Sequence, residues 1–153
     1  MSARQCRTKP DTGAAVAEPT DKVRRGTRDR DGERCPSCGT AYGLTYQHRQ
    51  AVGMGGSKKR PGYADGIAAC GTCNTAFEGE LQARALALGW KVRRWVKDAA
   101  LVPYWHEVTQ QWYRITHEGP WRTPISIREA ARMMLDVYGP DGPNGPGGAT
   151  TNG

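Results

Sequence analysis

Two Cys-x-x-Cys pairs constrain this chain more than any other feature of its sequence. Cys35 and Cys38 form the first pair, and Cys70 and Cys73 form the second. Each pair can place two sulfur ligands on one side of a tetrahedral ion, and the two pairs together complete a closed site. The spacing therefore predicts a structural zinc ion bound by all four thiols. A fifth cysteine, Cys6, has no partner at ligand spacing, and we assign it no role.

The overall charge favours a polyanionic partner. The chain has 153 residues, with 22 Lys and Arg against 15 Asp and Glu, and a net charge of +7. Such a balance points to nucleic acid first and to an acidic membrane surface second. No apolar run approaches membrane-spanning length, and the first thirty residues contain no signal-peptide core. We therefore expect a cytoplasmic protein, whose paired cysteines bind metal rather than form disulfides.

Composition divides the chain into four segments. Residues 1–32 are polar and charged, which predicts a disordered basic arm, and residues 139–153 read as a flexible Gly/Pro tail. Residues 33–80 hold few large hydrophobes, so zinc is expected to supply much of the folding energy of a zinc-stapled core at 33–90. Residues 91–138 form an aromatic-rich β extension that ends in a helix. The tryptophans favour a small hydrophobic core, with a base-stacking platform as the alternative.

Local patterns place the elements of an α+β fold. Short strands are expected at 43–48 and 67–69, joined by a loop at 53–62, and a helix at 74–88 has Thr72 available as N-cap and Gly89 as terminator. Further strands are expected at 91–96, 102–108 and 112–117. A last helix covers 127–138, with Ser126 as N-cap and Glu129 at the capping-box position.

The zinc-stapled core resembles the small phage type of the HNH endonuclease family. In that family a CxxC knuckle precedes a strand that ends on a histidine, a glycine-rich loop follows, and a metal ligand lies at the start of a helix. The matching stretches here are 46–49 (YQHR), 53–56 (GMGG), 65–70 (DGIAAC) and 73–74 (CN), within about residues 33–80. The resemblance implies a ββα-metal nuclease core with a four-cysteine zinc knuckle, in an HNN-like variant.

The resemblance implies a role for each matching residue. His48 falls at the general base, which removes a proton from the attacking water, and imidazole titrates in the right range for that task. Asn74 falls at the position of a ligand to a catalytic divalent ion such as Mg²⁺, Mn²⁺ or Ni²⁺, and Gln47 at a second ligand position. Asp65 falls at the middle asparagine, which orients the catalytic histidine. Without this context, His48 would read as a packing histidine.

DNA is the partner that this reading implies. Four basic residues flank the glycine-rich loop and are candidate phosphate contacts, although a basic run is also typical of a solvated loop: Arg49, Lys58, Lys59 and Arg60. The resemblance to phage proteins encoded near packaging genes further implies a terminase as partner, in an infected or prophage-bearing host cell. The alternative function is a catalytically silent zinc-ribbon module that binds DNA or a protein.

Overall fold

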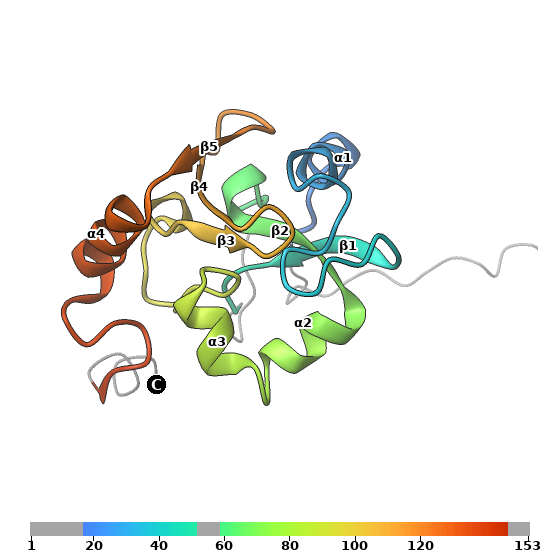
Figure 1. Ribbon diagram of the computed structural model, residues 1–153. Helices are drawn as coiled ribbons and strands as arrows, with labels where there is room; N and C mark the ends of the chain where they lie inside the picture. The colour runs from blue at the N-terminus through green and yellow to red at the C-terminus, as the bar shows by residue number, and fades with distance from the viewer. Residues whose placement is uncertain (1–16, 52–58, 147–153) are drawn as a thin grey trace, which may run out of the picture.

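The computed structural model describes residues 17–51 and 59–146, and this part of the chain has an α+β fold (Figure 1). The described residues form two small antiparallel sheets: β1 (Leu44–His48) with β2 (Gly66–Cys70), and β3 (Tyr104–His106), β4 (Gln111–Ile115) and β5 (Arg122–Ile125) in that order. The same residues form four helices, α1 (Asp21–Arg30), α2 (Gly71–Phe77), α3 (Gln82–Ala87) and α4 (Ile127–Tyr138). Short 3-10 turns, η2 (Tyr63–Asp65) and η3 (Ala99–Leu101), precede β2 and β3. In the two described ranges, every helix is too short or too polar to cross a membrane.

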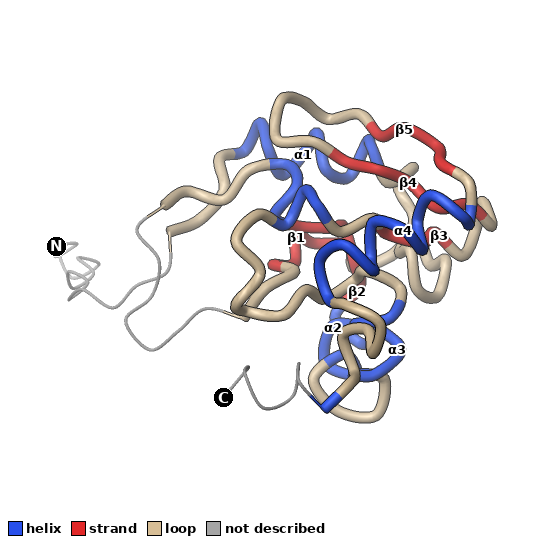
Figure 2. Tube along the Cα trace, turned by 90° about the vertical axis from the view of Figure 1, so that its left-hand side faces the viewer, coloured by secondary structure: helices blue, strands red, loops and turns tan. Residues whose placement is uncertain are grey.

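The β1–β2 hairpin lies between α1 on one side and α2 and α3 on the other, as both views show (Figures 1 and 2). Its register pairs Leu44 with Cys70 and His48 with Gly66, so the second cysteine pair and the histidine lie at opposite ends of the hairpin. All five residues of β2 are buried. Both strands were predicted from the sequence. Most of the predicted glycine-rich loop falls on residues 52–58, outside the described residues.

The single helix predicted at 74–88 is wrong. The chain forms α2 from Gly71 to Phe77 and then α3 from Gln82, with Cys70 rather than Thr72 as the N-cap of α2. The break allows both helices to reach the same core: Phe77 stacks on the Trp90 ring with centroids 5.4 Å apart, and Ala85 of α3 is fully buried in the same cluster. Gly89 follows α3 as predicted, at φ +78°, and a Cβ there would lie 1.8 Å from the Pro103 oxygen.

The aromatic region is only partly as predicted. The strand expected at 91–96 is absent, and Val92 instead makes one isolated bridge with Gln50. Strands β3 and β4 are shorter than expected, and β5 was missed because Pro124 lies inside it. Trp90 is fully buried in the core, whereas Trp121 is 54% exposed. The last helix is α4, and its Ser126 Oγ accepts from the Glu129 N–H at 3.0 Å, which confirms Ser126 as the N-cap; the Glu129 carboxylate pairs with Arg114.

The disordered arm predicted for residues 1–32 is wrong for the part that the structure describes. Residues 21–30 form α1, and the Arg30–Asp31 pair at its end is buried. Arg30 donates to the Tyr63 and Gly66 carbonyls at 2.8 and 3.0 Å, while Asp31 accepts from the Tyr104 hydroxyl at 2.5 Å. Ion pairing and hydrogen bonds therefore attach α1 to both sheets. A prediction based on hydrophobic residues does not detect contacts of this kind. Residues 1–16 lie outside the described part.

The predicted flexible tail is also ordered in its first half. Asn144 donates its side-chain amide to the Ala83 carbonyl of α3 at 2.8 Å. The Arg93 guanidinium donates to the carbonyl of Pro143, which is buried, at 3.0 Å. Residues 139–146 thus pack against the body of the protein through backbone and amide hydrogen bonds. The rest of the predicted tail, residues 147–153, lies outside the described residues.

Candidate metal centre and neighbouring cleft

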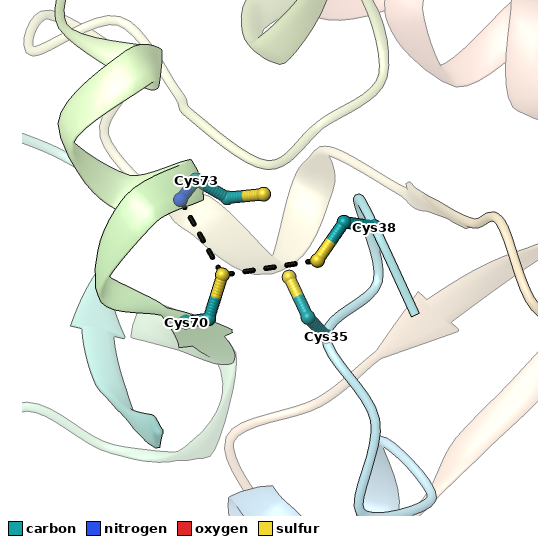
Figure 3. A group of neighbouring side chains, drawn as sticks. All are labelled: Cys35, Cys38, Cys70 and Cys73. Carbon is teal, nitrogen blue, oxygen red and sulfur yellow. Dashed lines mark hydrogen bonds between the residues drawn. The ribbon is translucent and has the colours of Figure 1, made fainter. Parts of the chain in front are cut away.

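The four predicted cysteines converge at one end of the hairpin (Figure 3). Their sulfur atoms all lie within 4.8 Å of one another, and the Cys38 and Cys70 sulfurs are 3.8 Å apart. Four sulfurs bonded to zinc at about 2.3 Å in a tetrahedron are separated by about 3.8 Å. The cluster could therefore hold one metal ion such as zinc, as the sequence predicted.

Local backbone geometry positions each cysteine pair. The first pair lies on a turn in which the Gly39 N–H donates to the Cys35 carbonyl at 2.8 Å, and Gly39 has the positive φ of +82° that the turn requires. The second pair spans the start of α2, where the Cys70 sulfur accepts from the Cys73 N–H at 3.4 Å. Burial raises the pKa of Cys35 and of Cys73. A metal ion bound here would therefore displace protons from these thiols.

His48 ends β1 at the opposite end of the hairpin from the thiols. Its ring stands edge-on to Tyr46, with centroids 5.4 Å apart, and its Nε2 is buried without a hydrogen-bond partner among the described residues. Burial is the main cause that lowers the pKa of His48. The charges of Lys91 and Arg24 lower it further, and those of Glu18 and Asp65 oppose the shift. The imidazole is therefore neutral at pH 7 and can accept a proton.

A cleft of about 360 Å³ opens beside His48. It brings together three residues that the sequence placed at one site, namely Gln47, His48 and Asn74. The Gln47 amide nitrogen donates to the Thr45 hydroxyl, so its carbonyl oxygen is the end left for a ligand. The remaining lining residues come from segments far apart in the sequence: Glu18, Gln50, Ala51, Glu78 and Lys91.

Two of these lining residues form an ion pair inside the cleft. The Lys91 ammonium lies 3.1 Å from a Glu78 carboxylate oxygen and donates to the His48 carbonyl at 3.1 Å. The Lys91 side chain is 13% exposed, whereas that of Glu78 is 60% exposed. Sequence reasoning placed neither residue at the site, and considered Lys91 only as part of a wider basic face. Glu78 lies one helical turn after Asn74, and this spacing could have indicated that the two side chains share one face of the helix. The sequence around Lys91 contains no comparable signal that would place it in the cleft.

Asp65 does not orient His48 as the sequence predicted. Its carboxylate accepts from the Gly62 N–H at 2.8 Å and lies 3.9 Å from Nδ1 of His117. Its backbone carbonyl accepts from the Arg49 N–H at 2.9 Å, directly after His48. Asp65 therefore shapes the turn that leads into β2, and its charge is one of several that act on the His48 pKa.

Arg49 is not a phosphate contact, because its side chain is fully buried. The guanidinium donates to four backbone carbonyls at 2.8–3.0 Å: Gly89, Ala64, Ala99 and Val102. Of the other predicted DNA contacts, Lys59 and Arg60 are exposed, and Arg60 donates to the Glu18 carbonyl at 2.7 Å, at the edge of the cleft. Lys58 lies outside the described residues.

The other two histidines are held by partners elsewhere. His106 Nε2 lies 2.9 Å from the Asp31 carbonyl in the interior, and His117 Nε2 lies 2.8 Å from an Asp98 carboxylate oxygen.

Comparison with protein-family models, with curated proteins and with solved structures gives no match for this chain. The function of this chain is therefore inferred from its cysteine cluster, its cleft and the residues that line the cleft.

Proposed function

We propose that this protein is a metal-dependent DNA endonuclease of the HNH type, built on the β1–β2 hairpin, α2 and a zinc ion at the four thiols. The observation that carries the proposal is the cleft that His48 shares with Asn74 and Gln47, where burial lowers the pKa of the imidazole. A general base needs a free nitrogen, a pKa below the working pH, and room for water and substrate. His48 lines such a cleft, and its pKa is lowered by burial.

The proposed reaction is hydrolysis of a phosphodiester bond. The His48 imidazole removes a proton from a water molecule as the water oxygen bonds to phosphorus, and the bond to the 3′ oxygen breaks. The products are a 3′ hydroxyl, protonated by solvent, and a 5′ phosphate. Removing a general base of this kind typically lowers a rate by about 10²–10⁴-fold.

The donor atoms around the cleft suit a hard divalent ion. Asn74 and Gln47 offer amide oxygens, and the Glu78 carboxylate lies in the same cleft, although sequence reasoning did not include it. Oxygen ligands of this kind match Mg²⁺ or Mn²⁺. When bound, such an ion would supply positive charge. That charge would stabilise the negative charge that develops on the phosphate during the reaction.

Plasmid nicking with added Mg²⁺, Mn²⁺ or Ni²⁺ tests the proposal, with the zinc-loaded protein and two histidine variants. His48→Ala should lose at least about 100-fold in rate. His117→Ala is the matched control, because His117 lies outside the cleft and pairs with Asp98; it should nick at the wild-type rate. Equal nicking by wild type and His48→Ala would remove His48 from the mechanism. No nicking with any of these ions would favour the zinc-ribbon binding module.

A further inference from the structure

A hydrogen-bonded turn places Lys91 in the cleft. The Trp90 and Lys91 N–H groups both donate to the Ala85 carbonyl, at 2.9 and 3.1 Å, at the end of α3. The next residue, Val92, donates to the Arg49 carbonyl at 2.8 Å, so the segment is tied on its other side to the strand end that carries His48. The backbone of Lys91 is therefore fixed relative to the imidazole.

The Lys91 ammonium group has a defined position, but its hydrogen-bonding capacity is only partly used. It carries three N–H donors. Within the described chain, one reaches the His48 carbonyl and another the Glu78 carboxylate, both at 3.1 Å. The buried stem limits the movement of Lys91, whereas Glu78 is mostly exposed at the rim. An ion pair with one exposed partner contributes little to stability, so the Glu78 carboxylate can leave at little cost.

We propose that Lys91 binds the scissile phosphate in this cleft, and that a phosphate oxygen takes the place of the Glu78 carboxylate on its ammonium group. This inference rests on the proposed function, because it assigns the substrate's phosphate to the same cleft. Lys91 would then be a catalytic residue that touches the substrate, and Glu78 would be its competitor in the free protein.

The chemistry of the cleft supports this exchange. A phosphodiester in the cleft brings a negative charge next to His48 and Asn74, where Lys91 is the cation among the lining residues and Glu18 and Glu78 are the anions. A cation already fixed beside the reacting group needs no reorganisation when charge develops, which makes it effective in stabilising a transition state.

Binding of a short DNA duplex to the zinc-loaded protein, without added divalent ion, tests phosphate contact directly. Lys91→Met should weaken binding and lower the slope of log affinity against log salt by about 1, the value expected for one lost phosphate contact. Lys97→Met is the matched control: Lys97 is exposed and lines a different pocket. It should change the slope by much less. Lys91→Arg keeps the charge and should keep the wild-type slope.

A double-mutant cycle tests the exchange with Glu78. Glu78→Gln should tighten DNA binding several-fold, and more than Glu80→Gln, an exposed neighbour that lies outside the cleft. The gain from Glu78→Gln should vanish in a Lys91→Met background, because no ammonium remains to be released. An equal gain in both backgrounds would overturn the exchange.

Nicking rates separate substrate contact from a structural role. Lys91→Met should lower kcat about 100-fold while zinc content and Tm stay near wild type, and Lys91→Arg should recover at least a tenth of the wild-type rate. An unchanged salt slope for Lys91→Met would overturn the proposal, whatever its nicking rate. If wild type does not nick DNA, the proposed function fails, and the salt slope still decides whether Lys91 contacts phosphate.

Discussion

Removal of the buried Arg49 side chain should destabilise the fold, because its guanidinium is the hydrogen-bond partner of several buried carbonyls. Burial lowers the pKa of Arg49 to about 10, so the group remains a cation at neutral pH. Its five N–H···O bonds reach four buried carbonyls, on Ala64, Gly89, Ala99 and Val102. The Ala99 carbonyl also accepts from the Val102 N–H at 3.0 Å. Among the described residues, the other three carbonyls have the guanidinium as their hydrogen-bond partner.

The loss of stability expected for Arg49→Met follows from those three carbonyls. A buried acceptor left without a partner costs about 1–3 kcal/mol, so Arg49→Met should cost at least about 3 kcal/mol from the three together. Relief from burying a charge offsets part of this, and we expect a net loss of about 2 kcal/mol in the free energy of unfolding. Arg49→Lys should also lose stability, because one ammonium cannot reproduce the planar fork.

Urea unfolding followed by tryptophan fluorescence, in buffer that contains zinc, measures this loss. Arg94→Met is the matched control, because Arg94 is exposed, and it should shift stability by less than about 0.5 kcal/mol. A loss below about 1 kcal/mol for Arg49→Met, at an unchanged m-value, would refute the reasoning. It would mean that the three carbonyls find other partners without the arginine.

Three more predictions concern the metal centre and the cleft. Cys70→Ser should lower the zinc content and Tm through loss of a ligand, whereas Cys6→Ser should change neither; retention of zinc by Cys70→Ser would contradict the four-thiol site. The nicking rate should rise with pH through a midpoint below 6.5 and level off by pH 7, because burial lowers the pKa of His48 and its neutral form is the base. A rate still rising tenfold per unit above pH 7 would exclude this. Asn74→Asp should bind divalent ions more tightly by calorimetry, because a charge replaces a dipole; weaker binding would exclude Asn74 as a ligand.

The sequence predicted the features that are encoded locally. The CxxC spacing predicts the thiol cluster because each pair is a single turn. Alternation and capping signals predict β1 and α4, whose Ser126 caps as expected. The gathering of His48, Gln47 and Asn74 at one cleft was also predicted, from the resemblance of the surrounding motif.

What the sequence did not predict depends on contacts between distant segments. A basic residue next to His48 reads as a surface group, and only the packing of residues 64, 89, 99 and 102 around Arg49 makes it internal. Helix α1 reads as disordered because its buried groups are Thr27, Arg30 and Asp31, which hydrophobicity does not detect. Glu18 and Lys91 reach the cleft from outside the motif, so motif spacing cannot place them.

The polar attachment of α1 has a consequence for protein engineering. A fragment that starts at Cys35 would keep all four thiols and His48, but it would remove the Asp31 carboxylate that accepts from the Ala68 N–H at 2.9 Å and from Tyr104. Those two donors belong to different sheets. Transplanting the motif into another scaffold would therefore require this helix as well, because the donors would otherwise be stranded in the interior.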